Sequence, residues 1–265
     1  MGKDRVEPGR GRRAKHVTPP PRGRGKGPFY ALLGGIAAIA AIFIAYQATR
    51  PDATAITLDA NTPLPQAEGY LLGDRAARIQ VLEFADFECP ACGQFATVTE
   101  PDVRKRLVET GTISFRFFDF PLAQHRNSWA ASMAAACANE QGKFWEMHDA
   151  IFEAQDRWAG TATSRPKGVL QGLASNIGLN VGQWESCFDS QKFRQNIAAN
   201  LQEGERRMVR STPTFIIGTK MIPGALTYDS FKAYVDSALA AAPAPETPVG
   251  GGDTARKSTI PPSSK

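Results

Sequence analysis

The stretch "FADFECPACG", residues 84–93, places Cys89 and Cys92 two residues apart, directly behind a short apolar run. A structural zinc site normally needs four ligands, often supplied as two close pairs. The other two cysteines lie far apart and the chain has three histidines, so we expect neither a metal nor another cofactor. A disulfide inside C-x-x-C closes a very small loop and restricts the unfolded chain little. Thiol–disulfide exchange is therefore the role that the pattern favours.

The spacing of the cysteines gives this role a physical basis. Pro90 lacks an N–H group and has a preset φ, which suits the first turn of a helix. Cys89 then lies at the helix N-terminus, where free backbone N–H groups and the helix dipole favour a thiolate. Cys92, one turn further in, can attack a mixed disulfide formed on Cys89. We expect Cys89 to be the exposed nucleophile and Cys92 the less accessible resolving thiol.

The elements around the cysteines indicate an α/β sheet with a helical insertion. Runs of β-branched and aromatic residues predict strands, and the helix after Cys89 should be kinked or interrupted at Pro101. Residues 125–209 show the apolar spacing of helices, and Phe231 and Val235 mark a closing helix. The strands are expected at residues 78–84, 112–120, 212–218 and 220–225.

Basic residues are concentrated at the N-terminus. Residues 1–50 carry ten of the 31 Lys and Arg but two of the 26 Asp and Glu, which leaves the remainder at −3. The folded part therefore has no excess of positive charge that would indicate a nucleic-acid partner. Residues 1–28 are rich in Arg, Lys, Pro and Gly, which predicts a disordered basic tail.

The next eighteen residues, 29–46, carry no charge. As a helix they would extend roughly 27 Å, enough to cross a bilayer core. Positive residues stay cytoplasmic, so the tail is expected inside and the domain outside the cell membrane. A cleaved signal peptide is the alternative, but its apolar region is usually shorter and needs small residues before the cleavage site. We expect a single-pass transmembrane anchor.

The remaining boundaries follow from composition. Residues 47–68 contain prolines and indicate a linker. Residues 242–265 are rich in Pro, Gly and Ser without periodicity, which predicts a second disordered tail. The functional domain is expected at 69–241, with its helical insertion at about 122–209.

Three stretches in this order resemble the DsbA-like branch of the thioredoxin superfamily: "VLEFADFECPAC", "CANEQGKFWEMHDAIF" and "TPTFIIG". The resemblance implies a thioredoxin-like fold with a helical insertion and thiol–disulfide exchange on proteins outside the cytoplasm. It assigns Cys89 as nucleophile and Cys92 as resolving thiol. It also implies reduced or unfolded exported proteins as clients, and a membrane redox partner of the DsbB or VKOR type.

The resemblance changes the interpretation of Pro213. An X-Pro bond ahead of a strand is usually trans, whereas the resemblance implies a cis bond facing the cysteines. A cis bond would turn the Thr212 backbone outward, where it could pair with a client peptide as an added strand. We therefore expect Thr212 and Pro213, together with Pro90 and Ala91, to contact the client.

Glu83 also has two interpretations. A lone glutamate on a strand is usually exposed, but the resemblance implies a buried acid beneath Cys92. Burial would raise its pKa and allow it to take the Cys92 proton. Two nearby acids, Asp86 and Glu88, are expected to be solvated loop charges.

Two histidines in the helical block are expected to be structural. His125 follows "FPLAQ" and is interpreted as a helix-capping or packing residue without a catalytic role. His148 falls on an apolar helix face and is expected in the core.

Cys137 and Cys187 remain after the active pair is assigned. An oxidising compartment makes unpaired thiols uncommon, although two buried free cysteines are the alternative. We expect a structural disulfide between them, which the resemblance supports.

The expected function is the introduction of disulfides into exported proteins. One departure leaves the direction open, because strong oxidants of this family carry a histidine inside the motif and this chain has Ala91 there. A less favoured thiolate would make the pair less oxidising, so a reductase or isomerase is the alternative. A binding module of the chaperone type, in which the cysteines are incidental, is a third possibility.

Overall fold

The computed structural model describes residues 27–48 and 64–242, and the chain divides into two units, Met1–Ala53 and Thr54–Lys265. The first unit contains helix α1, Gly27–Ala48, whose described large apolar side chains are exposed. Across the described residues, no helix has the length and apolarity that crossing a membrane requires. Outside the described residues lie almost all of the predicted tails 1–28 and 242–265, and most of the predicted linker 47–68.

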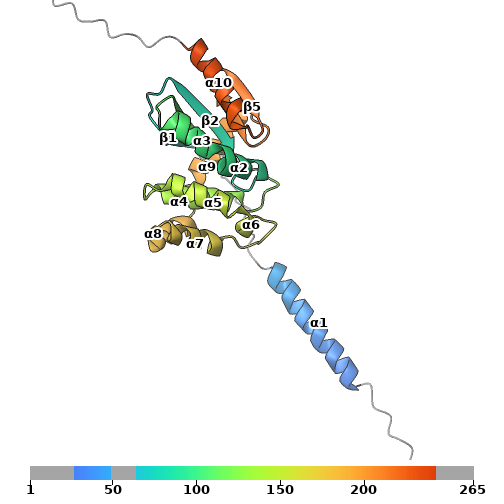
Figure 1. Ribbon diagram of the computed structural model, residues 1–265. Helices are drawn as coiled ribbons and strands as arrows, with labels where there is room; N and C mark the ends of the chain where they lie inside the picture. The colour runs from blue at the N-terminus through green and yellow to red at the C-terminus, as the bar shows by residue number, and fades with distance from the viewer. Residues whose placement is uncertain (1–26, 49–63, 243–265) are drawn as a thin grey trace, which may run out of the picture. The chain divides into compact units, whose positions relative to one another are not determined.

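The second unit is built on a five-stranded sheet with the order β1-β3-β2-β4-β5 (Figure 1). The two central strands, β2 and β3, run parallel, and the other neighbouring pairs are antiparallel. The predicted α/β fold is therefore confirmed. One edge strand, β1, was not expected, because three residues are too few to show an alternating pattern. The strands are β1 Tyr70–Leu72, β2 Ile79–Ala85, β3 Ile113–Asp119, β4 Thr214–Ile217 and β5 Lys220–Pro223.

The helical stretch after Cys89 continues past Pro101 to Val108, with π-helical turns on either side of the short α-helical segment that contains this proline. It alternates between α-helical and wider π-helical turns, and Pro101 lies in the first turn of α3. At that position a missing N–H breaks no helical hydrogen bond. The successive segments are α2 Pro90–Gln94, η1 Phe95–Thr99, α3 Glu100–Val103 and η2 Arg104–Val108.

Six helices between β3 and β4 form the predicted insertion. Figure 1 shows α4 to α8 gathered on one side of the sheet, while α10, Tyr228–Ala241, packs against β2 and β4. The insertion helices are α4 Ser128–Asn139, α5 Phe144–Glu153, α6 Gln155–Trp158, α7 Lys167–Asn176, α8 Val181–Asp189 and α9 Arg194–Arg206.

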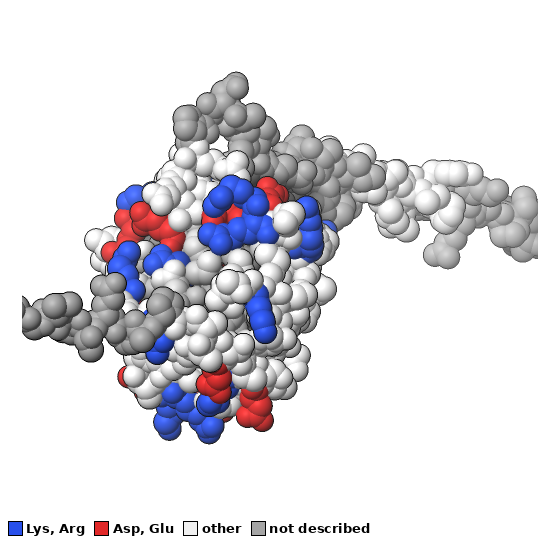
Figure 2. Space-filling view, turned by 90° about the horizontal axis from the view of Figure 1, so that it is seen from above, with Lys and Arg blue, Asp and Glu red and all other residues white. Residues whose placement is uncertain are grey.

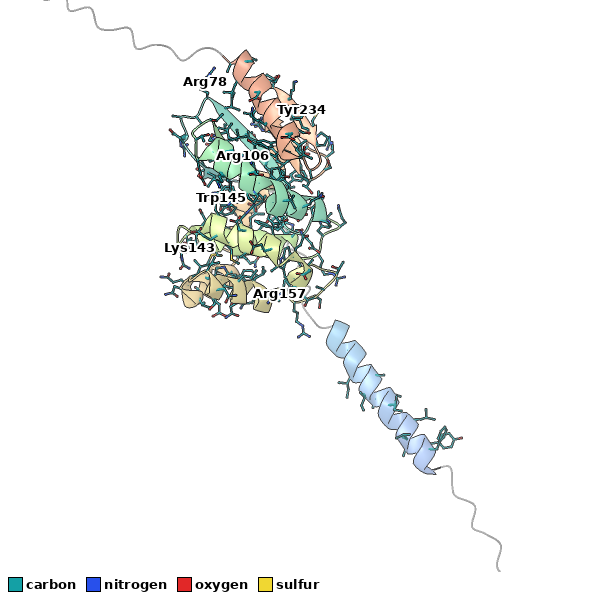
Figure 3. The ribbon with its side chains drawn as sticks, in the orientation of Figure 1. Arg78, Arg106, Lys143, Trp145, Arg157 and Tyr234 are labelled. Atoms are coloured by element: carbon teal, nitrogen blue, oxygen red, sulfur yellow. A yellow bond between two sulfur atoms is a disulfide. The ribbon has the colours of Figure 1, made fainter. Side chains whose placement is uncertain are left out.

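Trp145 of α5 joins the insertion to the sheet (Figure 3). Its ring packs against two buried clusters, one centred on the insertion and one on the sheet and α10. Its Nε1 donates to the Leu71 carbonyl oxygen of β1 at 3.1 Å. Because the indole supplies both apolar area and a satisfied donor, it fixes how the two halves meet.

Candidate active site

Cys89 lies at the junction between β2 and α2. Its backbone is extended, with φ −71° and ψ 123°, and α2 begins at Pro90. The Cys89 N–H donates to the Asp86 carbonyl oxygen at 3.0 Å, and the Cys89 carbonyl accepts from Gly93 N–H at 3.1 Å. The thiol therefore stands where the free N–H groups of the helix point.

The Thr212–Pro213 peptide bond is cis and lies beside this helix start. Antiparallel pairing of β2 with β4 sets Phe84 opposite Thr214, which brings the two loops together. Cys89 Sγ donates to the Thr212 carbonyl oxygen at 3.3 Å. The structure thus brings the C-x-x-C pair and the predicted client-binding residues Thr212 and Pro213 into one site.

The pKa of the Cys89 thiol is lowered from 9.0 to about 5. The largest cause is a hydrogen bond from the Cys92 thiol; burial opposes it, and the Thr212 hydroxyl and the N–H groups of Cys92 and Ala91 add to it. Among the described residues Thr212 Oγ1 is buried without a hydrogen-bond partner, so its hydroxyl is free to donate to a Cys89 thiolate, which can only accept. Ala91 therefore contributes through its backbone, and the motif favours a thiolate without a histidine side chain.

Cys92 has the opposite environment. It is fully buried, and this burial is the largest cause of a pKa well above the ordinary value. The hydrogen bond with Cys89 and the charges of Cys89 and Glu83 raise the pKa further. Cys89 is itself 7% exposed rather than open to solvent. The expectation of an exposed nucleophile was thus too strong, because the Thr212 loop covers it, but Cys89 remains the more accessible thiol.

Glu83 is buried on β2 and 2% exposed. Burial raises its pKa well above the ordinary value, the neighbouring Glu100 raises it further, and Arg104 lowers it. One carboxylate oxygen, Oε2, is buried without a hydrogen-bond partner among the described residues. The raised pKa favours the protonated form of this carboxyl group, which suits proton exchange with Cys92.

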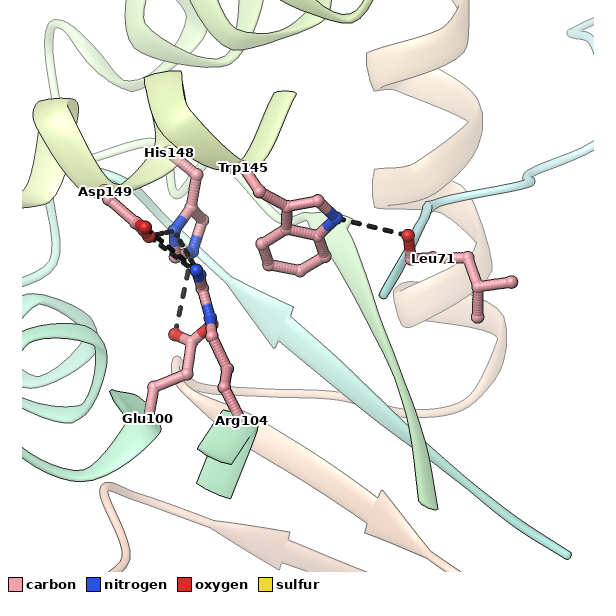
Figure 4. Close-up of polar contacts among 6 residues, drawn as sticks. All are labelled: Leu71, Glu100, Arg104, Trp145, His148 and Asp149. Carbon is pink, nitrogen blue, oxygen red and sulfur yellow. Dashed lines mark hydrogen bonds and ion pairs between the residues drawn. The ribbon is translucent and has the colours of Figure 1, made fainter. Parts of the chain in front are cut away.

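A charged network whose members Glu100 and Arg104 act on the pKa of Glu83 connects α3 and η2 to the insertion (Figure 4). Arg104 of η2 binds Glu100 at 2.6 Å and Asp149 at 2.7 Å. His148, enclosed by aromatic rings, has Nδ1 2.8 Å from Asp149 Oδ1 and Nε2 3.8 Å from Glu100 Oε2. His148 is in the core, as expected, but it lies beside buried Glu100 and links it to the partly exposed Asp149.

Asp86 and Glu88 correct the sequence interpretation, because they are 1% and 8% exposed rather than solvated. Asp86 accepts from His125 Nδ1 at 2.7 Å, from Leu122 N–H at 2.8 Å and from Glu88 N–H at 2.8 Å. It also accepts from the Ser128 hydroxyl. This carboxylate ties the active-site segment to the start of the insertion.

Glu88 makes a second tie, accepting from Asn127 N–H at 2.5 Å and Gly160 N–H at 2.6 Å. His125 does not cap a helix, because α4 begins after Asn127. Its hydrogen bond to Asp86 raises its pKa, and the charges of Glu88 and Cys89 add to that rise. The contact with Asp86 therefore favours the protonated form of His125 beside the active-site segment, a role that its local sequence did not indicate.

The other sequence-predicted cysteines lie in the insertion. A disulfide joins Cys137 of α4 to Cys187 of α8, with an S–S distance of 2.01 Å. Cys89 and Cys92 are both free thiols. Within residues 27–48 and 64–242, no group of three or more His, Cys, Asp or Glu side chains is arranged to hold a metal ion.

Comparison with known proteins identifies the family. Residues 66–237 match the family model described as thioredoxin. The Na(+)/H(+) antiporter NhaA 3 of Salinispora tropica is 32% identical over 186 residues, which is 70% of this chain and 27% of the antiporter. The chain thus spans about a quarter of that relative's length. Disulfide bond formation protein D of Bacillus subtilis is 24% identical over 189 residues, 68% of this chain and 82% of that protein.

Solved structures share the fold. The crystal structure of alpha-DsbA1 from Wolbachia pipientis has a TM-score of 0.59 and 23% sequence identity, and the match covers 67% of this chain and 94% of that one. With the family match over residues 66–237 and the cysteine pair beside a cis proline, these similarities show that the chain belongs to the thioredoxin family.

Proposed function

We propose that this protein is a membrane-anchored oxidase that introduces disulfides into exported proteins outside the cytoplasm. The observation that carries the proposal is the asymmetry of the pair: the pKa of Cys89 is lowered to about 5, whereas burial raises that of Cys92. A thiol of low pKa is a good leaving group, and a stabilised thiolate in the reduced form makes the disulfide a stronger oxidant.

In the first step, a client thiolate attacks Sγ of Cys89 in the Cys89–Cys92 disulfide. The bond between the two cysteines breaks, a client–Cys89 disulfide forms, and Cys92 leaves with the electron pair. Because its pKa is raised, Cys92 takes up a proton, which the protonated carboxyl group of the buried Glu83 supplies.

In the second step, another client thiolate attacks the client sulfur of the mixed disulfide. The client disulfide forms and Cys89 leaves as a thiolate, held by the backbone N–H groups of Ala91 and Cys92. Two electrons have then passed from the client to the pair. A membrane redox partner of the DsbB or VKOR type is proposed to remove them and restore the disulfide.

Client recognition is proposed to occur through the backbone at Thr212, as an added strand beside Pro213. Pro90 is exposed and Ala91 half-buried, so they form the rim beside Cys89. Figure 2 shows Lys and Arg in several separate groups, with Asp and Glu beside them and uncharged surface between.

The anchor is proposed at residues 29–46. Two features support this proposal: residues 29–46 carry no charge and follow a basic tail. In addition, the large apolar side chains described in α1 are exposed. Some side chains of this run lie outside the described residues, so the proposal rests on the sequence. Washing cell membranes with carbonate should leave the full chain bound and should release a variant that lacks residues 29–46. A mature, freely soluble chain beginning after residue 48 would contradict it.

The direction of exchange is tested with purified, oxidised protein and a reduced peptide that carries two cysteines. An oxidase should form one peptide disulfide per protein molecule without added oxidant, and should be reduced readily by glutathione. A reductase or isomerase should instead form no net peptide disulfide, and the disulfide of a reductase should resist reduction in the same glutathione buffer. Cys89→Ala should abolish exchange; retention of full activity would favour the chaperone-like binding module. Ion transport is not proposed, because the similarity covers 27% of the antiporter.

A further inference from the structure

Gln155, the first residue of α6, reaches from the insertion to the active-site segment. Its Nε2 lies 2.7 Å from the Phe87 carbonyl oxygen and 3.0 Å from the Cys89 carbonyl oxygen. A side-chain amide nitrogen has two hydrogens, and here both have an acceptor. Because both neighbours are acceptors, the nitrogen end of the amide must be the end that faces them.

Gly93 makes room for this contact. A Cβ atom at Gly93 would lie 3.0 Å from Gln155 Oε1 and 3.2 Å from Nε2, closer than ordinary contacts. Glycine in a helix is less stable than alanine, so a side chain here is disfavoured by the amide rather than by the helix itself. The glycine and the glutamine therefore act as one packed pair at the start of α2.

The contact holds the backbone on both sides of Glu88. Asp86 and Glu88 are tied to the insertion through their side chains, whereas Phe87 and Cys89 are held through their carbonyl groups by Gln155. With these carbonyls fixed, the first N–H groups of α2 stay aligned toward Cys89 Sγ, where they stabilise a thiolate. The amide also brings the positive ends of two N–H dipoles to this segment.

We propose that Gln155 is a positioning residue that fixes the Cys89 backbone at the start of α2 and thereby favours the Cys89 thiolate. The proposal deepens the proposed function, because it assigns part of the oxidising character of the pair to the insertion. Gln155 acts through the backbone and does not touch the client.

The first test is Gln155→Ala in the full chain with its native cysteines. The rate of Cys89 alkylation is measured against pH, with mass spectrometry to locate the label, and the pair is equilibrated with glutathione. A lost hydrogen bond typically changes an equilibrium severalfold. The alkylation midpoint should move to higher pH, and the pair should become a weaker oxidant by about threefold to tenfold. Gln155→Met keeps the size without the donors and should give the same shift if the alanine variant folds poorly.

The second test uses Gly93→Ala, which pushes on the amide without removing it. In the native background it should shift the midpoint in the same direction. In the Gln155→Ala background it should have no further effect, so the two changes should be non-additive. Gln171→Ala is the matched control, because that amide binds Glu185 at 2.9 Å elsewhere in the insertion. It should leave the midpoint unchanged.

Three results would be decisive. A variant that loses thermal stability while its alkylation midpoint and glutathione equilibrium stay unchanged would show a merely structural role and overturn the proposal. Additive effects of Gly93→Ala and Gln155→Ala would also overturn it. If Cys92 titrates below Cys89 in the unaltered protein, the proposed function fails instead, and this outcome is independent of residue 155.

Discussion

The sulfur of Cys89 and the carbonyl oxygen of Thr212 lie 3.3 Å apart, although 123 positions separate the two residues in sequence. Antiparallel pairing of β2 with β4 places the C-terminal end of β2, which leads to Cys89, beside the N-terminal end of β4, which follows Thr212. The site is thus assembled from the first and last parts of the domain. The insertion between them then contributes His125, Asn127 and Gln155 to the same segment.

This arrangement predicts which cysteine carries the client. Cys92→Ser should trap mixed disulfides through Cys89, because a hydroxyl cannot resolve them, whereas Cys89→Ser should trap almost none. The measurement is non-reducing electrophoresis of cell extracts followed by identification of the linked cysteine. Equal trapping by the two variants, or faster alkylation of Cys92 than of Cys89 at low pH, would show that the roles are assigned wrongly.

Thr212 should tune the nucleophile through its hydroxyl. Thr212→Val keeps the shape but removes a donor that lowers the pKa of Cys89, so the alkylation midpoint should rise above about 5. Because the pKa of Cys89 is lower in the folded state, ionisation of this thiol stabilises the reduced fold. The stabilisation is complete at pH values above the pKa of the thiol in the unfolded chain and is lost as pH falls through about 5. The valine variant should therefore lose stability in its reduced form at pH 7 and much less at pH 4.

The oxidised forms of both proteins serve as the control for this change. They have no Cys89 thiolate, so the valine substitution should change their stability by the same amount at both pH values. A pH-independent loss in the reduced form would point to packing at Thr212 rather than to the hydrogen bond.

Asp119, at the end of β3, makes a different pH dependence. It is fully buried, and burial raises its pKa from 3.8 to about 6, against hydrogen bonds from Asn200, Ser132 and Tyr70. The stabilisation of the fold by protonated Asp119 is complete below pH 3.8 and is lost as the pH rises to about 6. Asp119→Asn removes that loss, so it should gain up to about 3 kcal/mol relative to the unaltered protein between pH 3.5 and pH 7.

Denaturant unfolding at both pH values measures this gain. Asp236→Asn is the control, because Asp236 is an exposed carboxylate paired with Lys232, and it should show no comparable change. An Asp119→Asn variant whose relative stability is the same at pH 3.5 and pH 7 would contradict the assignment.

Local patterns were sufficient for the cysteine helix and the long strands. Three of the five strands, β2, β3 and β4, are runs of mostly buried residues, and Cys89-Pro90 carries a helix-start signal within two residues. The cis bond at Pro213 came from the resemblance, because an isolated X-Pro bond gives no such signal. The helical character of the insertion was readable because α5, α7, α8 and α9 bury apolar residues at helical spacing.

The polar contacts could not be read in the same way. Asp86 and Glu88 look like loop charges in the sequence, because the insertion residues that bind them lie more than thirty positions away. These partners are the N–H groups of Leu122 and Asn127 and the ring of His125. Glu100 and Arg104 have the i,i+4 spacing of a surface ion pair, yet Glu100 is buried against the insertion. Gln155 carries no local signal at all. In each case the partner comes from a segment whose position depends on the tertiary fold.

The disulfide in the insertion should stabilise the fold without taking part in exchange. Cys137 and Cys187 close a loop of 50 positions, which corresponds to about 4 kcal/mol in the chain-entropy model. The double variant Cys137→Ala, Cys187→Ala should lower the free energy of unfolding by up to that amount and leave the alkylation rate of Cys89 nearly unchanged. Loss of exchange in a variant that remains folded would indicate that the disulfide shapes the site.

Glu83 should control the fate of the Cys92 proton. Glu83→Gln removes a carboxyl group that burial holds near its protonated form, so the variant cannot exchange a proton with Cys92. The pKa of Glu83 is raised in the folded state, so the stabilisation of the fold by the protonated carboxyl group is complete at pH values below the ordinary pKa of glutamate. This stabilisation is lost as the pH rises. The glutamine variant should therefore be more stable than the unaltered protein at pH 7, and this advantage should disappear below pH 4. At the same time, resolution of a mixed disulfide by Cys92 should slow by about a hundredfold, at the lower end of the range for a general acid–base group.

The kinetic effect separates a proton relay from simple electrostatics. The glutamine also removes a negative charge that raises the pKa of Cys92, and this change alone would make Cys92 ionise more readily and resolve faster. Stopped-flow measurement of the resolution step across pH 6 to 9 distinguishes the two effects. A slower step whose pH dependence is lost in Glu83→Gln would support the relay, because the titrating group is gone. A faster step that keeps its pH dependence would show that Glu83 acts on Cys92 through charge alone. Glu153→Gln, an exposed change on α5, should leave both the rate and its pH profile as they are in the unaltered protein.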